Sequence, residues 1–388
     1  MIVVIADDIT GAAEIAAIGW QRGLNAQVRT AFGSNAGADL VVMDTDTRSA
    51  ASDTARDIVE DLSNRLCTMP VQWCFKKVDS VLRGNVGTEL EAIMTALGKT
   101  RTLLAPANPS KGRAIVDGRY FINHVPLDET EFGSDPEHPA RSSFVADLLN
   151  VSEGCPVHVS ERAAYSGQEK GIVVAEAGTG SDLSEWAECL DEQTLAAGGA
   201  DFFRAILDKR RPSGRVVPGE PLTPMEGPKL LVCGSRSETS RRAVAEASRL
   251  GIPVYPLPEA LFESPPPDDE GLLAQWAGDI VAALAPSEWA VIAIGPLGKR
   301  NAPSALDIRT QMAALVQQVV DRTRIREVFI EGGATAGAIL RRLGWDTLDV
   351  LGEYGPGVVR LAVNGSPEQT VTLKPGSYPW PGGMWTLR

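Results

Sequence analysis

The sequence is poor in the residues that build metal and disulfide sites. Histidine occurs three times in 388 residues, without HxH or HExxH spacing, so the sequence offers no histidine metal site. The five cysteines lie far apart and form no CxxC pair, and they are Cys67, Cys74, Cys155, Cys189 and Cys233. An odd number leaves at least one thiol unpaired in any disulfide scheme. We therefore expect all five to be reduced and to serve mostly as core residues.

Long apolar runs and an excess of positive charge are also missing. The longest apolar runs are far shorter than a bilayer span. The opening residues, MIVVIADD, lack the basic region and the cleavage site of a signal peptide, which predicts a cytoplasmic protein. The net charge of −13 argues against a nucleic-acid partner, which needs a basic face. An anionic small molecule stays compatible with this charge, because arginines and lysines gathered at one site can bind it.

What the sequence does contain is an alternation of short β-rich runs with helical patterns. The runs lie at 2–6, 26–29, 39–44, 71–76 and 102–105 in the first half, and at 230–233, 252–255, 290–294, 327–330 and 370–376 in the second. This order predicts an α/β fold with mostly parallel sheets flanked by helices.

The length predicts two domains, because 388 residues exceed one ordinary hydrophobic core. Periodicity disappears in the Pro- and Gly-rich segment DKRRPSGRVVPGEPLTPMEGPK. We therefore expect domains at 1–208 and 229–388, each with its own sheet, joined by a linker at 209–228.

Charged residues follow three predicted strands of the first half. Ligands bind beyond the carboxyl ends of parallel strands, where the loops converge. Carboxylates accept hydrogen bonds from neighbouring hydroxyls, while Arg and Lys bind a carboxylate or a phosphate. This mixture predicts a site for a small polyhydroxylated acid. Its members are Asp7 and Asp8 after the first strand, Arg48 after the run at 39–44, and Lys77, Asp79, Ser80 and Arg83 after the run at 71–76.

Simpler explanations exist for single members of this set. An aspartate at a helix N-terminus caps the helix, which explains one of Asp7 and Asp8 but not both. A surface ion pair explains either Arg48 or Arg83 taken alone. Adjacent buried acids are costly unless a ligand, a cation or a metal uses them, and this cost favours a site.

Residues 105–143 are rich in Pro, Gly and polar residues and predict a long loop of the lid or binding type, with a hairpin near 118–125. His124 and His138 are expected to be hydrogen-bonding loop residues. The other polar candidates of this segment are Asn108, Lys111, Arg113, Thr130, Glu131, Asp135 and Arg141.

The second half has glycine-rich turns after its predicted strands. Backbone N–H groups of such turns approach a phosphate closely, and the dipole of the following helix stabilises its charge. A tight turn or close helix–sheet packing is the alternative for any single glycine pair. Three such turns in one domain favour a nucleotide, although Walker A, GxGxxG, HRD and DFG motifs are absent. The turns contain Gly234-Ser235, the run Gly295 to Arg300, and Gly332-Gly333-Ala334-Thr335.

The sequence contains, in this order, the motifs ADDITGA, DTDTRS, KKVDSVLRGNVGTEL, PANPSKGRAIVDGRYFINHVPLDETEF, CGSRSETS, GGATAGAIL and LKPGSYPWP. With these motifs the chain resembles the four-carbon acid sugar kinases over nearly its whole length. The resemblance implies phosphorylation of the terminal (C4) hydroxyl of threonate, erythronate or 3-oxo-tetronate by ATP and Mg²⁺, in the cleft between the two domains. It implies sugar-acid contacts from Asp8, Arg48, Lys77, Asp79, Ser80 and Arg83, and ATP contacts from Ser235, Gly332, Gly333, Ala334, Thr335 and Gly376. Ala334 replaces an acidic residue common in that turn, and GSYPWPGG replaces an SGNFG-like ending.

For the mechanism we expect Asp8 to accept the hydroxyl proton and Asp7 to orient the substrate or a metal. An aspartyl-phosphate phosphatase and a non-catalytic sugar-acid sensor are the alternatives. The phosphatase usually needs a DxD spacing, and the sensor leaves the glycine turns unexplained. Stereochemistry, metal ligands and homo-oligomerisation are left open by the sequence.

Overall fold

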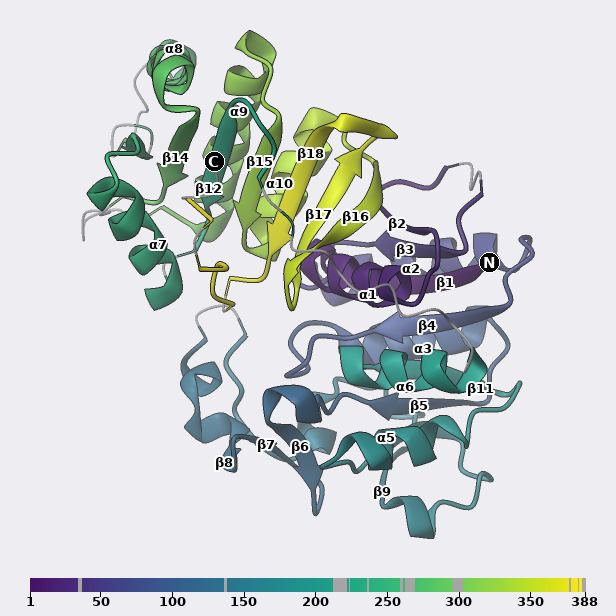
Figure 1. Ribbon diagram of the computed structural model, residues 1–388. Helices are drawn as coiled ribbons and strands as arrows, with labels where there is room; N and C mark the ends of the chain where they lie inside the picture. The colour runs from purple at the N-terminus through teal and green to yellow at the C-terminus, as the bar shows by residue number, and fades with distance from the viewer. Residues whose placement is uncertain are drawn as a thin grey trace. The chain divides into compact units, whose positions relative to one another are not determined.

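The computed structural model divides the chain into two compact units, with elements labelled as in Figure 1. The first unit comprises Met1–Ala26 and Ser34–Val217, and the second comprises Gln27–Gly33 and Pro218–Arg388. The structure describes residues 1–33, 37–135, 138–211, 222, 224–235, 237–258, 261, 269–295, 303–376, 378–382 and 384–385. Most of the predicted linker, residues 212–221 and 223, lies outside the described residues.

The sheet of the first unit is parallel and has the strand order β3-β1-β4-β11-β5-β10-β9. Several strands, including β1, are buried at every residue, as expected for a parallel sheet covered on both faces. The strands are β1 (Ile2–Ala6), β3 (Leu40–Asp44), β4 (Trp73–Lys77), β5 (Arg101–Ala105), β9 (Val157–Ser160), β10 (Gly171–Ala175) and β11 (Thr194–Gly198).

Helices pack along this sheet in two groups. Helix α2 contacts α3, and Val59 of α2 and Leu90 of α3 share one core with Val3 and Val41 of the strands. Helix α6 contacts both α1 and α5. The helices are α1 (Ile9–Gln21), α2 (Ser52–Leu66), α3 (Val86–Ala96), the short α4 (Val145–Leu148), α5 (Gly180–Ala187) and α6 (Ala200–Arg210), with a 3₁₀ turn η4 (Arg162–Ala164).

The hairpin predicted near 118–125 is confirmed, because Arg119–Ile122 pairs antiparallel with Val125–Pro126. The rest of the predicted long loop was too simple a picture, because Arg113–Val116 adds a third strand to form a small antiparallel sheet. Asp117 and Gly118 have φ of 50° and 72°, which gives the two-residue hairpin turn between β6 and β7. Asn123 and His124, with φ of 48° and 69°, make the next turn. Tyr120 anchors this sheet in the core of the first unit. Its elements are η1 (Pro109–Lys111), β6 (Arg113–Val116), β7 (Arg119–Ile122), β8 (Val125–Pro126), η2 (Leu127–Glu129) and η3 (Glu131–Ser134).

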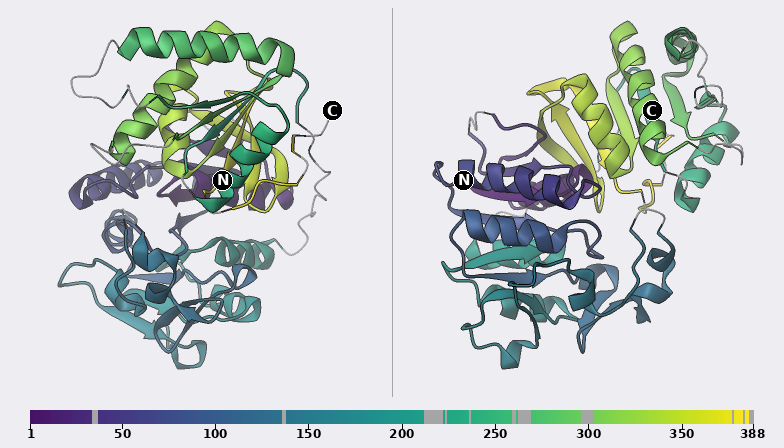
Figure 2. Two further views of the ribbon diagram at one scale, coloured as in Figure 1. Left: turned by 90° about the vertical axis from the view of Figure 1, so that its left-hand side faces the viewer. Right: turned by 180° about the vertical axis from the view of Figure 1, so that it is seen from behind.

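The second unit has a mixed sheet with the order β13-β14-β12-β15-β18-β17-β16-β2. Neighbouring strands in the part β13-β14-β12-β15-β18 pair in parallel. The pairs β18-β17, β17-β16 and β16-β2 are antiparallel. The strands are β2 (Ala26–Arg29), β12 (Lys229–Cys233), β13 (Val254–Pro256), β14 (Trp289–Ala293), β15 (Glu327–Glu331), β16 (Thr347–Gly355), β17 (Val358–Val363) and β18 (Ser366–Lys374). Helices α8 (Asp269–Ser287), α9 (Ala305–Arg322) and α10 (Gly333–Leu343) pack side by side in that order, and α7 (Glu238–Arg249) contacts β13 and β14 (Figure 2).

Strand β2 belongs to the sheet of the second unit although it lies near the start of the chain. It pairs antiparallel with β16, with Val28 opposite Leu348. The Gln27 side chain donates to Asp349 Oδ1 at 2.7 Å, next to this pairing. The sequence predicted one boundary, at 209–228, and did not assign residues 27–33 to the second unit.

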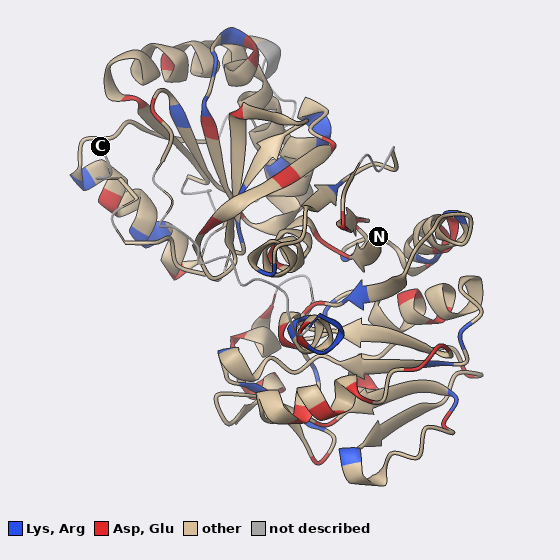
Figure 3. Ribbon diagram, turned by 45° about the vertical axis from the view of Figure 1, so that its right-hand side comes forward, with Lys and Arg blue, Asp and Glu red and all other residues tan. Residues whose placement is uncertain are grey.

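The sheet of the second unit buries charged residues, and Figure 3 shows acidic and basic positions close together on its strands. Arg360 donates Nε to Glu327 Oε1 at 2.9 Å and Nη2 to Glu327 Oε2 at 2.7 Å, near the amino end of β15. Lys374 and Glu331 are both fully buried at the carboxyl ends of β18 and β15, and Lys374 Nζ lies 3.3 Å from Glu331 Oε2. Charged residues are unexpected at these buried positions, because each ion loses its hydration inside the sheet.

All five cysteines are free thiols. In the described part of the chain, no helix is both long and apolar enough to cross a membrane.

Candidate active site

The two aspartates after β1 are joined by one arginine. Arg48 donates Nε to Asp7 Oδ2 at 2.7 Å and Nη2 to Asp8 Oδ1 at 2.8 Å. Asp8 is also the N-cap of α1, because its Oδ1 accepts the N–H of Gly11 at 3.0 Å. The capping explanation therefore holds for Asp8, but Asp7 makes no cap and is held by Arg48.

The loop after β4 brings a third carboxylate to the same arginine. Asp79 Oδ1 lies 3.6 Å from Arg48 Nη1. The carboxylate of Asp79 also accepts Nε and Nη2 of Arg83, at 3.0 and 2.9 Å. Carboxylates from two strand ends thus share one mostly buried guanidinium.

Backbone strain marks this loop. Leu82 has φ of 62°, an unusual value for a residue with a bulky side chain. Gly84 has φ of 85°, and a Cβ at this position would lie 2.7 Å from the carbonyl oxygen of Arg48. The loop therefore passes against the backbone of Arg48, and such strain is often stored at functional sites.

The charges of the cluster fix its ionisation. Burial raises the pKa of Asp8, but the positive charges of Arg48 and Lys77 outweigh it and lower the pKa below its ordinary value. Burial also raises the pKa of Asp79, but the positive charges of Arg83 and Arg48 outweigh it and hold the pKa well below its ordinary value of 3.8. Burial lowers the pKa of Arg48, but its three carboxylate neighbours raise the pKa well above its ordinary value. Asp8, Asp79 and Arg48 are therefore all charged at neutral pH.

Lys77 lies beside Asp8 across Gly11. A Cβ on Gly11 would come within 2.7 Å of Asp8 Oδ1 and 3.2 Å of Lys77 Nζ, so only glycine fits here. Lys77 is buried and donates to the carbonyl of Val78 at 2.8 Å. This places a second cation next to the Asp8 carboxylate.

The sequence interpretation missed Glu14, one helical turn after Gly11 on α1. Glu14 forms an ion pair with Lys111. Burial raises the pKa of Glu14, but Lys111 and Lys77 outweigh it and lower the pKa. The spacing from Thr10 to Glu14 along one helix face was the available signal.

Ser80 lies outside the ion-pair cluster and contacts the small antiparallel sheet. Its hydroxyl accepts Nη1 of Arg113, and its carbonyl accepts the hydroxyl of Tyr120. Arg113 and Arg83 both lie over the ring of Phe132, at 5.8 and 5.5 Å from its centroid. The segment 105–143 thus forms part of the surroundings of the cluster.

The glycine turns of the second unit meet at the carboxyl ends of β12 and β15. Gly332 has φ of 93° and precedes α10, whose first-turn N–H groups lack intrahelical acceptors. A Cβ on Gly234 would lie 2.1 Å from Thr335 Oγ1, so the turn after β12 packs directly on this helix start. Gly376, after β18, accepts the Ser237 hydroxyl through its carbonyl at 3.2 Å. Ala334 is exposed.

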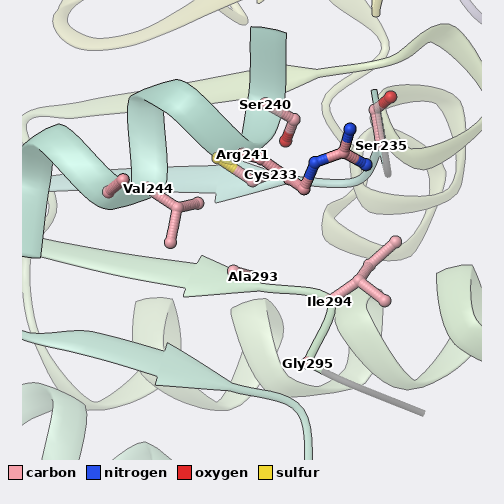
Figure 4. A pocket seen from close by; sticks show the side chains of 9 residues that line it. Cys233, Ser235, Ser240, Arg241, Val244, Ala293, Ile294 and Gly295 are labelled. Carbon is pink, nitrogen blue, oxygen red and sulfur yellow. The ribbon is translucent and has the colours of Figure 1, made fainter. Parts of the chain in front are cut away.

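A pocket of about 380 Å³ opens beside these turns (Figure 4). Ser235 and Arg241 lie on one side of it, and Ala293 and Ile294 lie on the other. The lining combines apolar side chains with the polar side chains of Ser235, Ser240 and Arg241, a mixture common in small-molecule sites. Gly295 also lines the pocket, whereas Gly298, Lys299 and Arg300 lie outside the described residues.

No group of three or more His, Cys, Asp or Glu residues within the described ranges could hold a metal ion.

Comparison with known proteins gives a class to each unit. Residues 2–206 match the sugar-binding N-terminal domain, and residues 230–378 match the nucleotide-binding C-terminal domain. The fold and the matched domains thus define a two-domain α/β protein that combines a sugar-binding with a nucleotide-binding domain. The chain belongs to the four-carbon acid sugar kinase family.

Relatives of known activity are similar over almost their whole length. A D-threonate kinase of Salmonella typhimurium is 28% identical, with 91% of this chain and 89% of the relative covered. A 3-oxo-tetronate kinase of Methylobacterium radiotolerans is 27% identical, with 96% and 95% covered.

Solved structures share the fold. A Salmonella typhimurium LT2 structure has a TM-score of 0.78 at 22% identity and covers 97% of this chain and 96% of its own. A Haemophilus influenzae structure has a TM-score of 0.72 at 21% identity, with 99% and 98% covered.

Proposed function

We propose that the protein is an ATP-dependent kinase that phosphorylates the terminal (C4) hydroxyl of a four-carbon sugar acid. The observation that carries the proposal is that one chain holds two complementary sites. The sugar-binding domain holds carboxylates around Arg48, and the nucleotide-binding domain holds a glycine turn at the start of α10. The names of the relatives support threonate or 3-oxo-tetronate as the class of substrate.

In the first unit we assign substrate binding to Asp8, Arg48, Lys77, Asp79, Ser80 and Arg83. The carboxylates accept hydrogen bonds from substrate hydroxyls, and the cations bind the substrate carboxylate. Asp8 accepts the hydrogen bond of the reacting hydroxyl. As the oxygen–phosphorus bond forms and the bond to ADP breaks, the proton moves to Asp8. Because its pKa is lowered, Asp8 acts chiefly by aligning the hydroxyl, which suits the loose transition state of phosphoryl transfer.

In the second unit we assign nucleotide binding to Ser235, Gly332, Gly333, Ala334, Thr335 and Gly376. Gly332 and Gly333 place no side chain at the start of α10, and the first N–H groups of this helix fit a phosphate. The pocket next to Ser235 fits the base.

Mg²⁺ is proposed to accompany ATP and to neutralise charge on the transferred group. Mg²⁺ in such sites is held by substrate phosphates, water and one or two carboxylates, so a dedicated cage of protein ligands is not required. Asp7 is the candidate carboxylate, because its buried Oδ1 has no hydrogen-bond partner among the described residues. We also propose a cytoplasmic location, which suits five free thiols.

The test is incubation of the purified protein with ATP, Mg²⁺ and a panel of four-carbon acids while ADP is measured. The panel contains D-threonate, D- and L-erythronate and 3-oxo-tetronate. We expect ADP release that depends on one of these acids. Acid binding without ADP release would support the sensor, and phosphate release from phosphoesters would support the phosphatase; either result would refute the kinase.

A further inference from the structure

Two of the proposed nucleotide-binding turns lie on neighbouring strands. Strands β15 and β18 are parallel, and Glu331 is in register with Lys374 at their carboxyl ends. Gly332 follows the first strand and Gly376 follows the second. The N–H of Gly332 donates to the carbonyl of Lys374 at 2.9 Å, so the two turns begin side by side.

The Lys374 ammonium is enclosed by the loop that carries Gly376. It is fully buried and donates to the carbonyls of Pro375 at 2.9 Å and Tyr378 at 2.5 Å. Its remaining partner is Glu331, whose Oε2 lies 3.3 Å away. Three donors thus meet three acceptors, and two of these acceptors belong to the loop.

Glu331 also binds the loop that carries Gly376, through Trp380. Its Oε2 accepts the indole N–H of Trp380 at 3.0 Å. The ring of Trp380 in turn lies 5.1 Å from Lys374 Nζ. Pro375, Tyr378 and Trp380 are therefore all held by one buried ion pair.

This loop reaches the third nucleotide-binding turn. The carbonyl of Gly376 accepts the Ser237 hydroxyl, and a Cβ on Gly376 would lie 3.4 Å from Ser235 Oγ. A shift of the loop would consequently move Gly376 relative to Ser235.

Stability alone does not account for a charged pair at this place. An apolar pair of similar volume usually stabilises a core as well as a buried ion pair does, because both ions lose their hydration. Burial lowers the pKa of Lys374 and raises that of Glu331, which reflects this cost. What an apolar pair cannot do is bind two loop carbonyls and an indole N–H in fixed directions.

We propose that Lys374 and Glu331 are positioning residues for the nucleotide: they hold the Gly376 loop against the Gly332 turn at the spacing that the phosphates require. The inference rests on the proposed function of the second unit. Neither side chain contacts the nucleotide in this account, so both act through the backbone of the two turns.

The test compares Lys374→Met with Lys229→Met. Lys229 is a matched control, because it is buried in the same sheet at the amino end of β12. Its Nζ donates to the carbonyl of Gly227 at 2.7 Å. The same Nζ lies 3.3 Å from Glu288 Oε2 and 5.5 Å from the centroid of the Trp289 ring. Both variants lose the same kinds of contact, but only one of them lies beside the turns.

For Lys374→Met we expect the Kd for ADP, measured by calorimetry, and the KM for ATP to rise about tenfold or more. The KM for the sugar acid is expected to stay within about twofold of wild type. Lys229→Met is expected to lower the melting temperature less, because the Glu288 carboxylate stays exposed to solvent, and to leave the Kd for ADP unchanged.

Glu331→Gln is the second variant, for the case that Lys374→Met does not fold. It keeps the size of the side chain and an acceptor for Trp380 but removes the charge, and we expect a smaller rise in the Kd for ADP. Variants at both positions that bind ADP like wild type would overturn the inference while the proposed kinase stands. A wild-type protein that binds no ADP would refute the proposed function itself, and the inference with it.

Discussion

At the scale of the residue, Arg48 is the centre of the first site, because carboxylates from two strand ends depend on its charge. Arg48→Met leaves Asp7 and Asp8 buried without their shared cation. Removal of one partner from a buried pair costs about 3–5 kcal/mol. We expect a loss of this size in the free energy of unfolding by urea. Arg48→Lys, which keeps the charge but loses the fork of the guanidinium, is expected to lose less; a loss below about 1 kcal/mol in the Met variant would contradict this account.

Asp8 is expected to matter for turnover and not for the nucleotide. Asp8→Asn removes the charge that aligns and accepts the hydroxyl, and we expect the kcat to fall about 100-fold or more. The Kd for ADP stays unchanged. Asp191→Asn is the control, because Asp191 also pairs with an arginine of the first unit, Arg101 at 2.6 Å, away from the cluster. Normal turnover by Asp8→Asn would remove Asp8 from the proton-accepting role.

Asp79 makes stability depend on acid pH. Its pKa in the folded protein is well below the ordinary value of 3.8, so the ionised form stabilises the fold above that value. This contribution is lost as the pH falls from about 4 toward the lower folded-state pKa. We expect the free energy of unfolding to fall over this range. In Asp79→Asn the fall should be shallower, and identical slopes for the two proteins would show that Asp79 does not contribute.

At the scale of the element, the turn after β12 tests how the second site is built. Gly234→Ala places a Cβ against Thr335 at the start of α10, where the nearest atom would be 2.1 Å away. The turn and the helix must separate, so we expect the Kd for ADP to rise about tenfold or more. The KM for the sugar acid should not change.

Gly278→Ala on α8 is the matched control for this prediction. Its Cβ meets nothing within 4 Å, and alanine in a helix is about 1 kcal/mol more favourable than glycine. We expect unchanged ADP binding and a slightly higher melting temperature. Equal ADP affinity in the two alanine variants would show that the close approach of Gly234 is not needed.

The elements also show what the sequence can reveal. Strands such as β1 and β12 were predictable because each is a short, continuous apolar run. Strand β16 was not, because its alternating residues TLDVLGEYG contain two glycines and its pairing with β17 has register shifts. Lys111 was among the polar candidates, but Glu14 was missed, because their pairing depends on the path of the segment after β5. Lys374 and Glu331 look like surface residues in the sequence, and only the structure reveals that they are buried.

At the scale of the whole molecule, the second unit takes β2 from the first 33 residues of the chain. The sequence shows that 26–29 is a strand but not which strand it pairs with, since its partner β16 comes more than 300 residues later. A fragment of residues 218–388 would expose the edge of β16, and exposed edges promote association between chains. We expect this fragment to self-associate in size-exclusion chromatography with light scattering. The same fragment with residues 24–33 joined through a flexible linker should unfold at a higher temperature, because β16 regains its partner. A monomeric fragment without β2 would contradict the importance of this pairing.

The central claim is that the first unit binds the sugar acid and the second unit binds the nucleotide. Hydrogen–deuterium exchange of the intact protein, with each ligand added separately, tests this claim most directly. With ADP we expect protection of peptides that contain residues 332–337 and 234–240, and no change at 7–11 or 79–85. With D-threonate, or whichever acid of the panel supports ADP release, we expect the reverse pattern. Protection of the strand ends around Asp8 and Asp79 by ADP, with the turn at Gly332 unaffected, would contradict the account.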